Sequence, residues 1–201
     1  MADQLLPDDL FAAIGRVAAA SARLEEAIRD IAIDHADTGL GHGSVIFEGQ
    51  SMDWLISNGV AVIDSELSVP SLVEREPETY SALLELRELT KSASALKNDR
   101  NIVVHGVWRA KCWLADYDEA DFEDGGLPRC TPRSSRSRRN DEPLFHVNRS
   151  RYRQVFGQEQ AWTVSDVLAV ASTTNSYIER LVGAQRAYKA AFASDFERRR
   201  G

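Results

Sequence analysis

The segment from Asp8 to about His35 carries a long and regular hydrophobic pattern. Its apolar residues recur at three- and four-residue steps, namely Leu10, Phe11, Ile14, Val17, Ala20, Leu24, Ile28 and Ile31. This period is typical of an amphipathic helix, whose apolar side must be covered by other elements. Three glycines between positions 36 and 43 then predict that the helix stops and a loop follows. The rest of the chain must therefore cover one long helical face.

Two further helices are predicted in the first half of the chain. One begins at Ser51, where Asp53 supports the first turn, and continues to about Leu67. The next begins at Pro77, a residue that suits the start of a helix. Its apolar stripe consists of Ala82, Leu86, Leu89, Ala93 and Leu96, and the same period leads on to Arg100 and Val103. Gly106 is a natural stop for this helix.

The last helix is predicted to start near Thr163 and to continue past Val182. Thr163 and Asp166 have the spacing of a capping box, in which each residue caps the other's backbone N–H. The sequence thus predicts four principal helices. We expect an all-α fold in which residues 1–201 form a single domain, a size that one hydrophobic core can support.

Residues 107–160 are expected to form an insertion before the last helix. Apolar residues alternate from Val107 to Leu114, which is typical of a strand, and the segment from Leu144 to Phe156 is its expected return partner. The sequence therefore predicts a small antiparallel β-hairpin attached to the helices.

A flexible loop is predicted between the two strands, over residues 116–142. An acidic run, Asp116 to Asp124, is followed by an Arg/Ser-rich run, Arg129 to Arg139, with prolines and paired glycines nearby. Such a composition is typical of a disordered segment, because it offers little apolar surface to bury.

Composition limits the classes of function. The formal net charge of −7 argues against a protein that coats nucleic acid with its whole surface, since such binding needs many Lys and Arg side chains. No signal-peptide pattern or membrane-spanning apolar run is present in the sequence, so we expect a cytoplasmic protein with no membrane partner. Cys112 and Cys130 have no metal-ligand spacing and are interpreted as free thiols.

The most informative motif lies at the end of the third principal helix. Arg100 is followed by the polar Asn101, then by three β-branched residues, then by His105 and Gly106. The spacing of Arg and His alone is weak, because such pairs occur by chance. Its position at a helix end, after a long apolar stripe, makes it a candidate site.

This motif resembles the signature of the HEPN family, an Arg, often with a polar residue after it, and a His four to six residues later. The order of the helices, with residues 8–106 and 163–192 as the shared part, is also similar to the family's four-helix bundle. The resemblance implies a metal-independent endoribonuclease that acts as a homodimer, with motifs from both subunits in one cleft. The residues carried over are Arg100, Asn101 and His105.

The chemistry of these side chains agrees with that implication. When the 2′-hydroxyl of RNA attacks the neighbouring phosphate, the enzyme must move protons and stabilise a phosphorane. An imidazole such as His105 exchanges protons near neutral pH, and the guanidinium of Arg100 can contact two phosphate oxygens. Asn101 can orient the imidazole or the phosphate by hydrogen bonding.

Helix geometry raises a problem for this site. At about 100° per residue, Arg100 and His105 point about 140° apart, whereas Asn101 and His105 share a face. Three solutions remain open. The last turn can unwind near Gly106, the long Arg100 side chain can wrap round the helix, or a second subunit can complete the site. The resemblance implies the last of these.

Several other interpretations remain open for the motif. His105 can be a helix C-terminal imidazole favoured by the helix dipole, and Arg100 can be paired with an acidic neighbour such as Asp99. The alternative function is a non-catalytic HEPN-like interaction module, or one that binds a nucleotide or phosphate without cleaving it. A third hypothesis is that the protein is a purely structural helical dimer. Some toxin-type members of the family are silenced by a nucleotidyltransferase partner and carry a Tyr two residues after the His. This chain has Val107 at that position, which argues against this mode of control.

A second candidate is a basic surface around the predicted hairpin. Its arginines could bind phosphates, with nearby aromatic rings stacking on bases, or the positive run could simply neutralise the acidic run. The residues are Arg129, Arg133, Arg136, Arg138, Arg139, Arg149, Arg151 and Arg153, with Trp108, Trp113, Tyr152 and Trp162. His42 could approach a ligand, and His35 and His146 are interpreted as surface or packing residues. No sequence motif predicts a cofactor or a metal.

Overall fold

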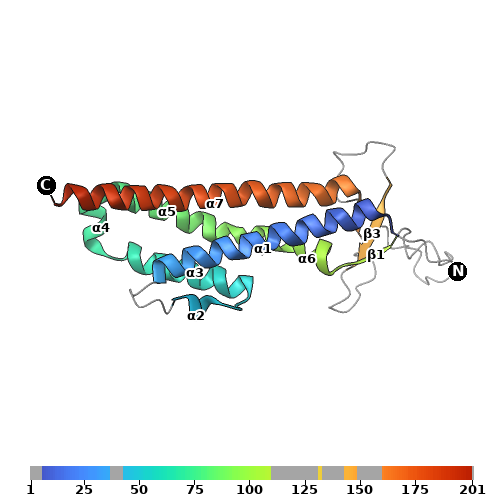
Figure 1. Cartoon of the computed structure of the whole chain (residues 1–201), viewed down its shortest axis with the longest axis horizontal. Helices are drawn as coiled ribbons and strands as arrows, with labels where there is room; N and C mark the ends of the chain where they lie inside the picture. Colours follow the sequence, from blue (N-terminus) through green and yellow to red (C-terminus); the bar gives the residue numbers. More distant parts are fainter. Residues whose placement is uncertain (1–5, 37–42, 110–130, 133–142, 149–159, 201) are drawn as a thin grey trace, which may run out of the picture. The chain divides into compact units, whose positions relative to one another are not determined.

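The computed structural model describes residues 6–36, 43–109, 131–132, 143–148 and 160–200, and Figure 1 shows its helices and strands. In chain order these are α1 (Asp8–Ala36), α2 (Gly43–Phe47), α3 (Met52–Leu67), α4 (Pro70–Arg75), α5 (Pro77–Ser92), η1 (Ala93–Leu96), α6 (Lys97–His105), β1 (Val107–Arg109), β2 (Thr131–Pro132), β3 (Phe145–Asn148), β4 (Gln160–Trp162) and α7 (Val164–Arg198). The chain divides into two compact units. Unit 1 comprises Met1–Ala19 and Asn98–Ser172, and unit 2 comprises Ala20–Lys97 and Thr173–Gly201.

Unit 2 is built from helices that share one apolar core. The later part of α1, the helices α3 and α5, and the later part of α7 each contribute side chains that are almost fully buried: Leu24, Ile28, Leu55, Ile63, Leu83, Leu86 and Leu181. Each of these helices thus buries one apolar side, as the sequence period predicts for α1, α3, α5 and α7. The mostly helical class of the fold is confirmed.

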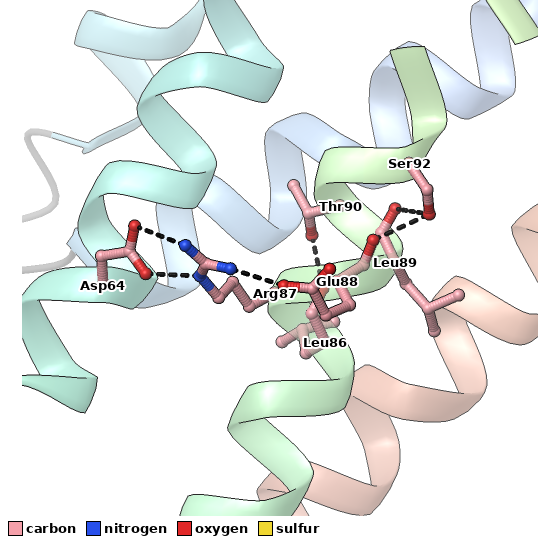
Figure 2. A network of polar contacts seen from close by, with 7 residues as sticks. All are labelled: Asp64, Leu86, Arg87, Glu88, Leu89, Thr90 and Ser92. Carbon is pink, nitrogen blue, oxygen red and sulfur yellow. Dashed lines mark hydrogen bonds and ion pairs between the residues drawn. The ribbon is translucent and has the colours of Figure 1, made fainter. Parts of the chain in front are cut away.

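A charged fork joins α3 to α5 within unit 2 (Figure 2). Arg87 Nε donates to Asp64 Oδ1 at 2.5 Å, and Arg87 Nη2 donates to Asp64 Oδ2 at 3.3 Å. Planar two-point contacts of this kind fix geometry better than a single ion pair does. The fork therefore sets the relative rotation of two helices whose apolar sides already face each other.

The helix predicted from Pro77 to His105 is not continuous. A 3-10 segment, η1, separates α5 from α6. Serine hydroxyls at this point donate to helix carbonyls: Ser92 Oγ to Glu88 O at 2.7 Å and Ser94 Oγ to Lys91 O at 3.1 Å. Figure 2 shows the Ser92 contacts. Because such bonds compete with the regular helical pattern, the Ser-containing stretch is where the helix tightens.

Unit 1 contains a small sheet packed on helical residues. The strand order is β1-β3-β4-β2, in which β1, β3 and β4 are antiparallel neighbours and the two-residue β2 pairs parallel with β4. Trp108 lies opposite Val147 in the β1–β3 register. The apolar cluster of unit 1 joins β3 and β4 to both long helices and to α6, through Leu10, Val17, Val103, Phe145, Val147, Trp162 and Val167.

The predicted antiparallel pairing is confirmed for the first residues of each predicted strand, since β1 pairs with β3. The sequence did not predict β4, nor the short helices α2 and α4. The predicted loop over 116–142 lies outside the described residues except for β2. No helix in the described part of the chain combines the length and apolar character needed to cross a membrane.

The capping box at the start of α7 is confirmed. Thr163 Oγ1 accepts from the Asp166 backbone N–H at 3.0 Å, and Asp166 Oδ2 accepts from the Thr163 N–H at 3.0 Å. These reciprocal bonds satisfy two donors that would otherwise lack a helical partner.

Gly106 lets the chain leave α6 and enter the sheet. Its N–H donates to the Ile102 carbonyl at 2.9 Å, so it closes the last turn. Among the described glycines, only Gly49 has a φ in the left-handed region, so backbone conformation does not explain the glycine at position 106. The reason for glycine is space, because a Cβ here would overlap both the Ile102 carbonyl oxygen and Val147 Cγ2.

We predict that Gly106→Ala lowers the free energy of unfolding by about 2 kcal/mol, since the added methyl group forces α6 away from β3. Urea unfolding followed by circular dichroism measures this change. Gly183→Ala is the matched control, because a Cβ at this helical position meets nothing within 4 Å. Alanine there should leave stability unchanged or raise it. Equal stability of the two variants would contradict this account.

Candidate functional site

The residues of the Arg-Asn-x-x-x-His motif lie on α6 in unit 1. Val103 and Asn101 are buried, whereas His105 is exposed and Arg100 is half-buried. The apolar side of the short helix therefore anchors it to the core of unit 1. This anchoring leaves the imidazole at the surface, where a ligand can reach it.

The Arg100 side chain reaches both other motif residues. Its Nη1 donates to Asn101 Oδ1 at 2.9 Å and lies 3.5 Å from His105 Nε2. Of the three solutions to the angular problem, this is the second, in which the long arginine side chain wraps round the helix. One chain thus brings the guanidinium and the imidazole together.

Asn101 has a different environment from its two partners. The residue is 5% exposed, and its amide oxygen accepts from Arg100. A buried amide suits the holding of a neighbouring group better than direct contact with a large substrate. This hydrogen bond holds the guanidinium beside Asn101 and can limit the positions that the Arg100 side chain takes.

Trp108 braces the last turn of α6. Its Nε1 donates to the Val103 carbonyl at 2.9 Å, and its ring lies edge-on to Trp162, with centroids 6.1 Å apart. Carbonyls in the last turn of a helix lack helical partners, so the indole N–H supplies a missing donor. Sequence reasoning assigned neither this bond nor this role to Trp108.

The proposed aromatic surface is corrected for one residue. Trp162 is fully buried and its Nε1 donates to Gln160 Oε1 at 3.1 Å, so it cannot stack on a base at the surface. It belongs to the core of unit 1 because β4 turns it inward beside Phe145 and Val147. The other members of that predicted surface lie outside the described residues except Trp108.

The remaining candidates from the sequence have varied outcomes. His42, Cys112 and Cys130 lie outside the described residues. His146 is on β3, and partial burial lowers the pKa of its imidazole. Its Nδ1 has no hydrogen-bond partner among the residues that the structure describes. This environment favours a neutral packing residue.

A polar cluster in unit 2 was not predicted. The His35 side chain is 1% exposed, and its Nδ1 lies 2.8 Å from Glu66 Oε1. Tyr188 donates its hydroxyl to Glu66 Oε2 at 3.1 Å and packs its ring against His35. Burial, followed by the Glu66 charge, raises the pKa of Tyr188 well above its usual value. His35 is thus a packing residue that joins α1, α3 and α7.

The described residues contain no group of three or more His, Cys, Asp or Glu side chains placed to hold a metal ion. Comparison with protein-family models, with curated proteins and with solved structures finds no match to this chain. The function of this chain must therefore be inferred from the geometry of the site and from the motif.

We predict that Trp108→Phe increases amide hydrogen exchange in the last turn of α6, with a loss of about 1 kcal/mol in the local opening free energy. Phenylalanine keeps a ring but removes the donor to Val103, which leaves a carbonyl unsatisfied. Trp54→Phe is the control, since no indole hydrogen bond of Trp54 is found among the described residues. Unchanged protection at Val103 and His105 in Trp108→Phe would refute the bracing role.

Proposed function

We propose that this protein is a metal-independent endoribonuclease of the HEPN type, with its active site at a homodimer interface. The observation that carries the proposal is the 3.5 Å approach of the Arg100 guanidinium to the exposed imidazole of His105 within one chain. A fixed cation beside a proton-transfer group is what cleavage of a phosphodiester by the neighbouring 2′-hydroxyl requires.

In this mechanism the 2′-oxygen attacks the adjacent phosphorus and the bond to the 5′-oxygen breaks. The products are a 2′,3′-cyclic phosphate and a 5′-hydroxyl, so no water or metal is consumed. Arg100 contacts the phosphorane oxygens, and Asn101 holds the guanidinium from below. His105 removes the proton from the 2′-hydroxyl or gives one to the 5′-oxygen.

Two imidazoles serve this reaction better than one, because one proton is removed while another is supplied. Each chain contributes one His105 to the motif, so two copies facing one cleft would provide a base and an acid. This chemistry supports a homodimer with RNA as the substrate, and the cytoplasm is the location that we propose for it. An antitoxin or another regulatory protein is a further partner in keeping with the resemblance.

Purified protein should cleave RNA in the presence of EDTA. Arg100→Ala and His105→Ala should each lower the rate at least about 100-fold, since each removes one part of the transition-state machinery. Gel analysis of a labelled RNA measures the rate, and the cyclic phosphate end identifies the reaction.

Arg109→Ala is the matched control, because this arginine is close in sequence and exposed on β1 but lies outside the motif. Its rate should equal that of the wild type. Cleavage that is abolished by EDTA, or that is equal in all three variants, would reject this site. Tight binding of RNA without cleavage would favour the phosphate-binding module instead.

The dimer generates a separate prediction. Sedimentation should give a mass about twice the 22.4 kDa of the chain at concentrations where the enzyme is active. Specific activity should fall on dilution as the copies separate, because each copy alone lacks the second imidazole. A monomer with constant specific activity across the same range would contradict the shared cleft.

A further inference from the structure

Two polar links connect α1 to α7 within unit 2. Arg23 Nη2 donates to Asn175 Oδ1 at 2.6 Å. Further along both helices, Asp34 Oδ2 accepts from Gln185 Nε2 at 2.7 Å and lies 2.6 Å from Lys189 Nζ. Residue numbers rise together at the two links, so these parts of α1 and α7 run in parallel. The links fix the two helices at two separate levels.

A pocket of about 420 Å³ lies between the two links. Its apolar lining comes from both helices and consists of Ala27, Ile31, Ile178 and Val182. From Arg23 to Asp34 is 11 residues, or about 16 Å along a helix, which limits the length of an occupant. A volume of this size is in the range of pockets that hold small molecules.

The carboxylates that line the pocket differ in whether they have a hydrogen-bond or ion-pair partner. Glu26, Asp30 and Asp34 follow one another at four-residue steps on α1 and all line it. Asp34 is engaged by Gln185 and Lys189. In contrast, Glu26 and Asp30 form no hydrogen bond or ion pair with any residue that the structure describes. One wall of the pocket therefore presents two solvent-exposed carboxylates that have no direct partner among the described residues.

The electrostatics of Asp30 agree with this geometry. Partial burial raises the pKa of its carboxyl, the charges of Glu26 and Asp34 raise it further, and Arg29 and Lys189 oppose the shift. The folded chain thus disfavours the ionised form. A bound cation would remove that penalty, whereas an anion would increase it. The pocket's own cations are all exposed, and of these Arg23 and Lys189 are held in the two links, whereas Arg186 belongs to neither.

We propose that the pocket between α1 and α7 binds a small organic ammonium compound with an apolar body. The ammonium group contacts the Asp30 and Glu26 carboxylates, and the body packs on Ile31, Ile178 and Val182. This site is separate from the α6 motif and does not depend on ribonuclease activity.

Three probes of similar shape test the charge requirement with the full-length chain: 2-phenylethylamine, 2-phenylethanol and 3-phenylpropionate. Binding is measured by calorimetry and by amide chemical shifts in α1 and α7. We expect the amine to bind at least about tenfold more tightly than the alcohol, as one hydrogen bond to a charged group allows, and the carboxylate to bind most weakly. Binding of the amine should weaken as pH falls, because Asp30 takes up a proton.

Two variants locate the site. Asp30→Asn should weaken amine binding about tenfold, and Val182→Phe should block it by filling the pocket. Glu85→Gln, an exposed change on α5, should bind like the wild type, and circular dichroism checks that each variant folds. No binding of the amine, equal binding of the alcohol or the carboxylate, or undiminished binding by Asp30→Asn would overturn the proposal.

Discussion

The hydrogen bond from the Trp108 indole to the Val103 carbonyl is the interaction on which the candidate site depends. It satisfies the end of α6 at the point where the chain turns into β1, and it is 2.9 Å long. Gly106 lets the same turn approach β3, since no side chain intervenes. A helix of nine residues has little stability of its own, so these contacts and the buried Val103 hold it in place. His105 is thereby kept at a defined position although it is exposed.

The polar groups of the two units have different consequences. In unit 1, Arg100 is held by Asn101 and remains beside an accessible imidazole, an arrangement suited to a phosphate. In unit 2, the His35, Glu66 and Tyr188 contacts fasten helices that apolar packing has already brought together. The links from Arg23 and Asp34 also join helices, α1 and α7, and the pocket that lies between the two links has an apolar lining from both helices. In unit 2, polar contacts thus fasten packed helices at one place and border a pocket at another.

The helices with a clear period were predictable, because burial of one side needs only local information. The first helix, the start of α3 at Ser51 and the Thr163–Asp166 capping box agree with the structure. The break between α5 and α6 was not predicted, because the apolar residues keep a helical period through this stretch. The serine-to-carbonyl bonds of Ser92 and Ser94 leave no mark on that pattern. The strand β4 was missed because Gln160–Trp162 is too short for an alternating pattern.

The position of the candidate site was likewise predictable in part. The motif identified Arg100, Asn101 and His105, but helix angles alone left three ways to unite the arginine with the histidine. In the structure, the long Arg100 side chain wraps round the helix and reaches both Asn101 and His105. The sequence alone does not show which rotamers these side chains adopt. Trp162 was considered as a stacking residue because it lies near the Arg-rich stretch in the sequence, and no local pattern shows which side of the short strand β4 it faces. The burial of His35 depends on partners that are 31 and 150 residues away, which no local pattern contains.

We propose that Arg100 and His105 of one chain act as a single unit on one phosphate. NMR of the arginine guanidinium and histidine imidazole nitrogens, during titration with a 2′-deoxy oligonucleotide that cannot be cleaved by this route, tests it directly. The resonances of Arg100 and His105 should move together and saturate at one common dissociation constant. A response from only one of the two side chains, or from neither, would contradict the claim.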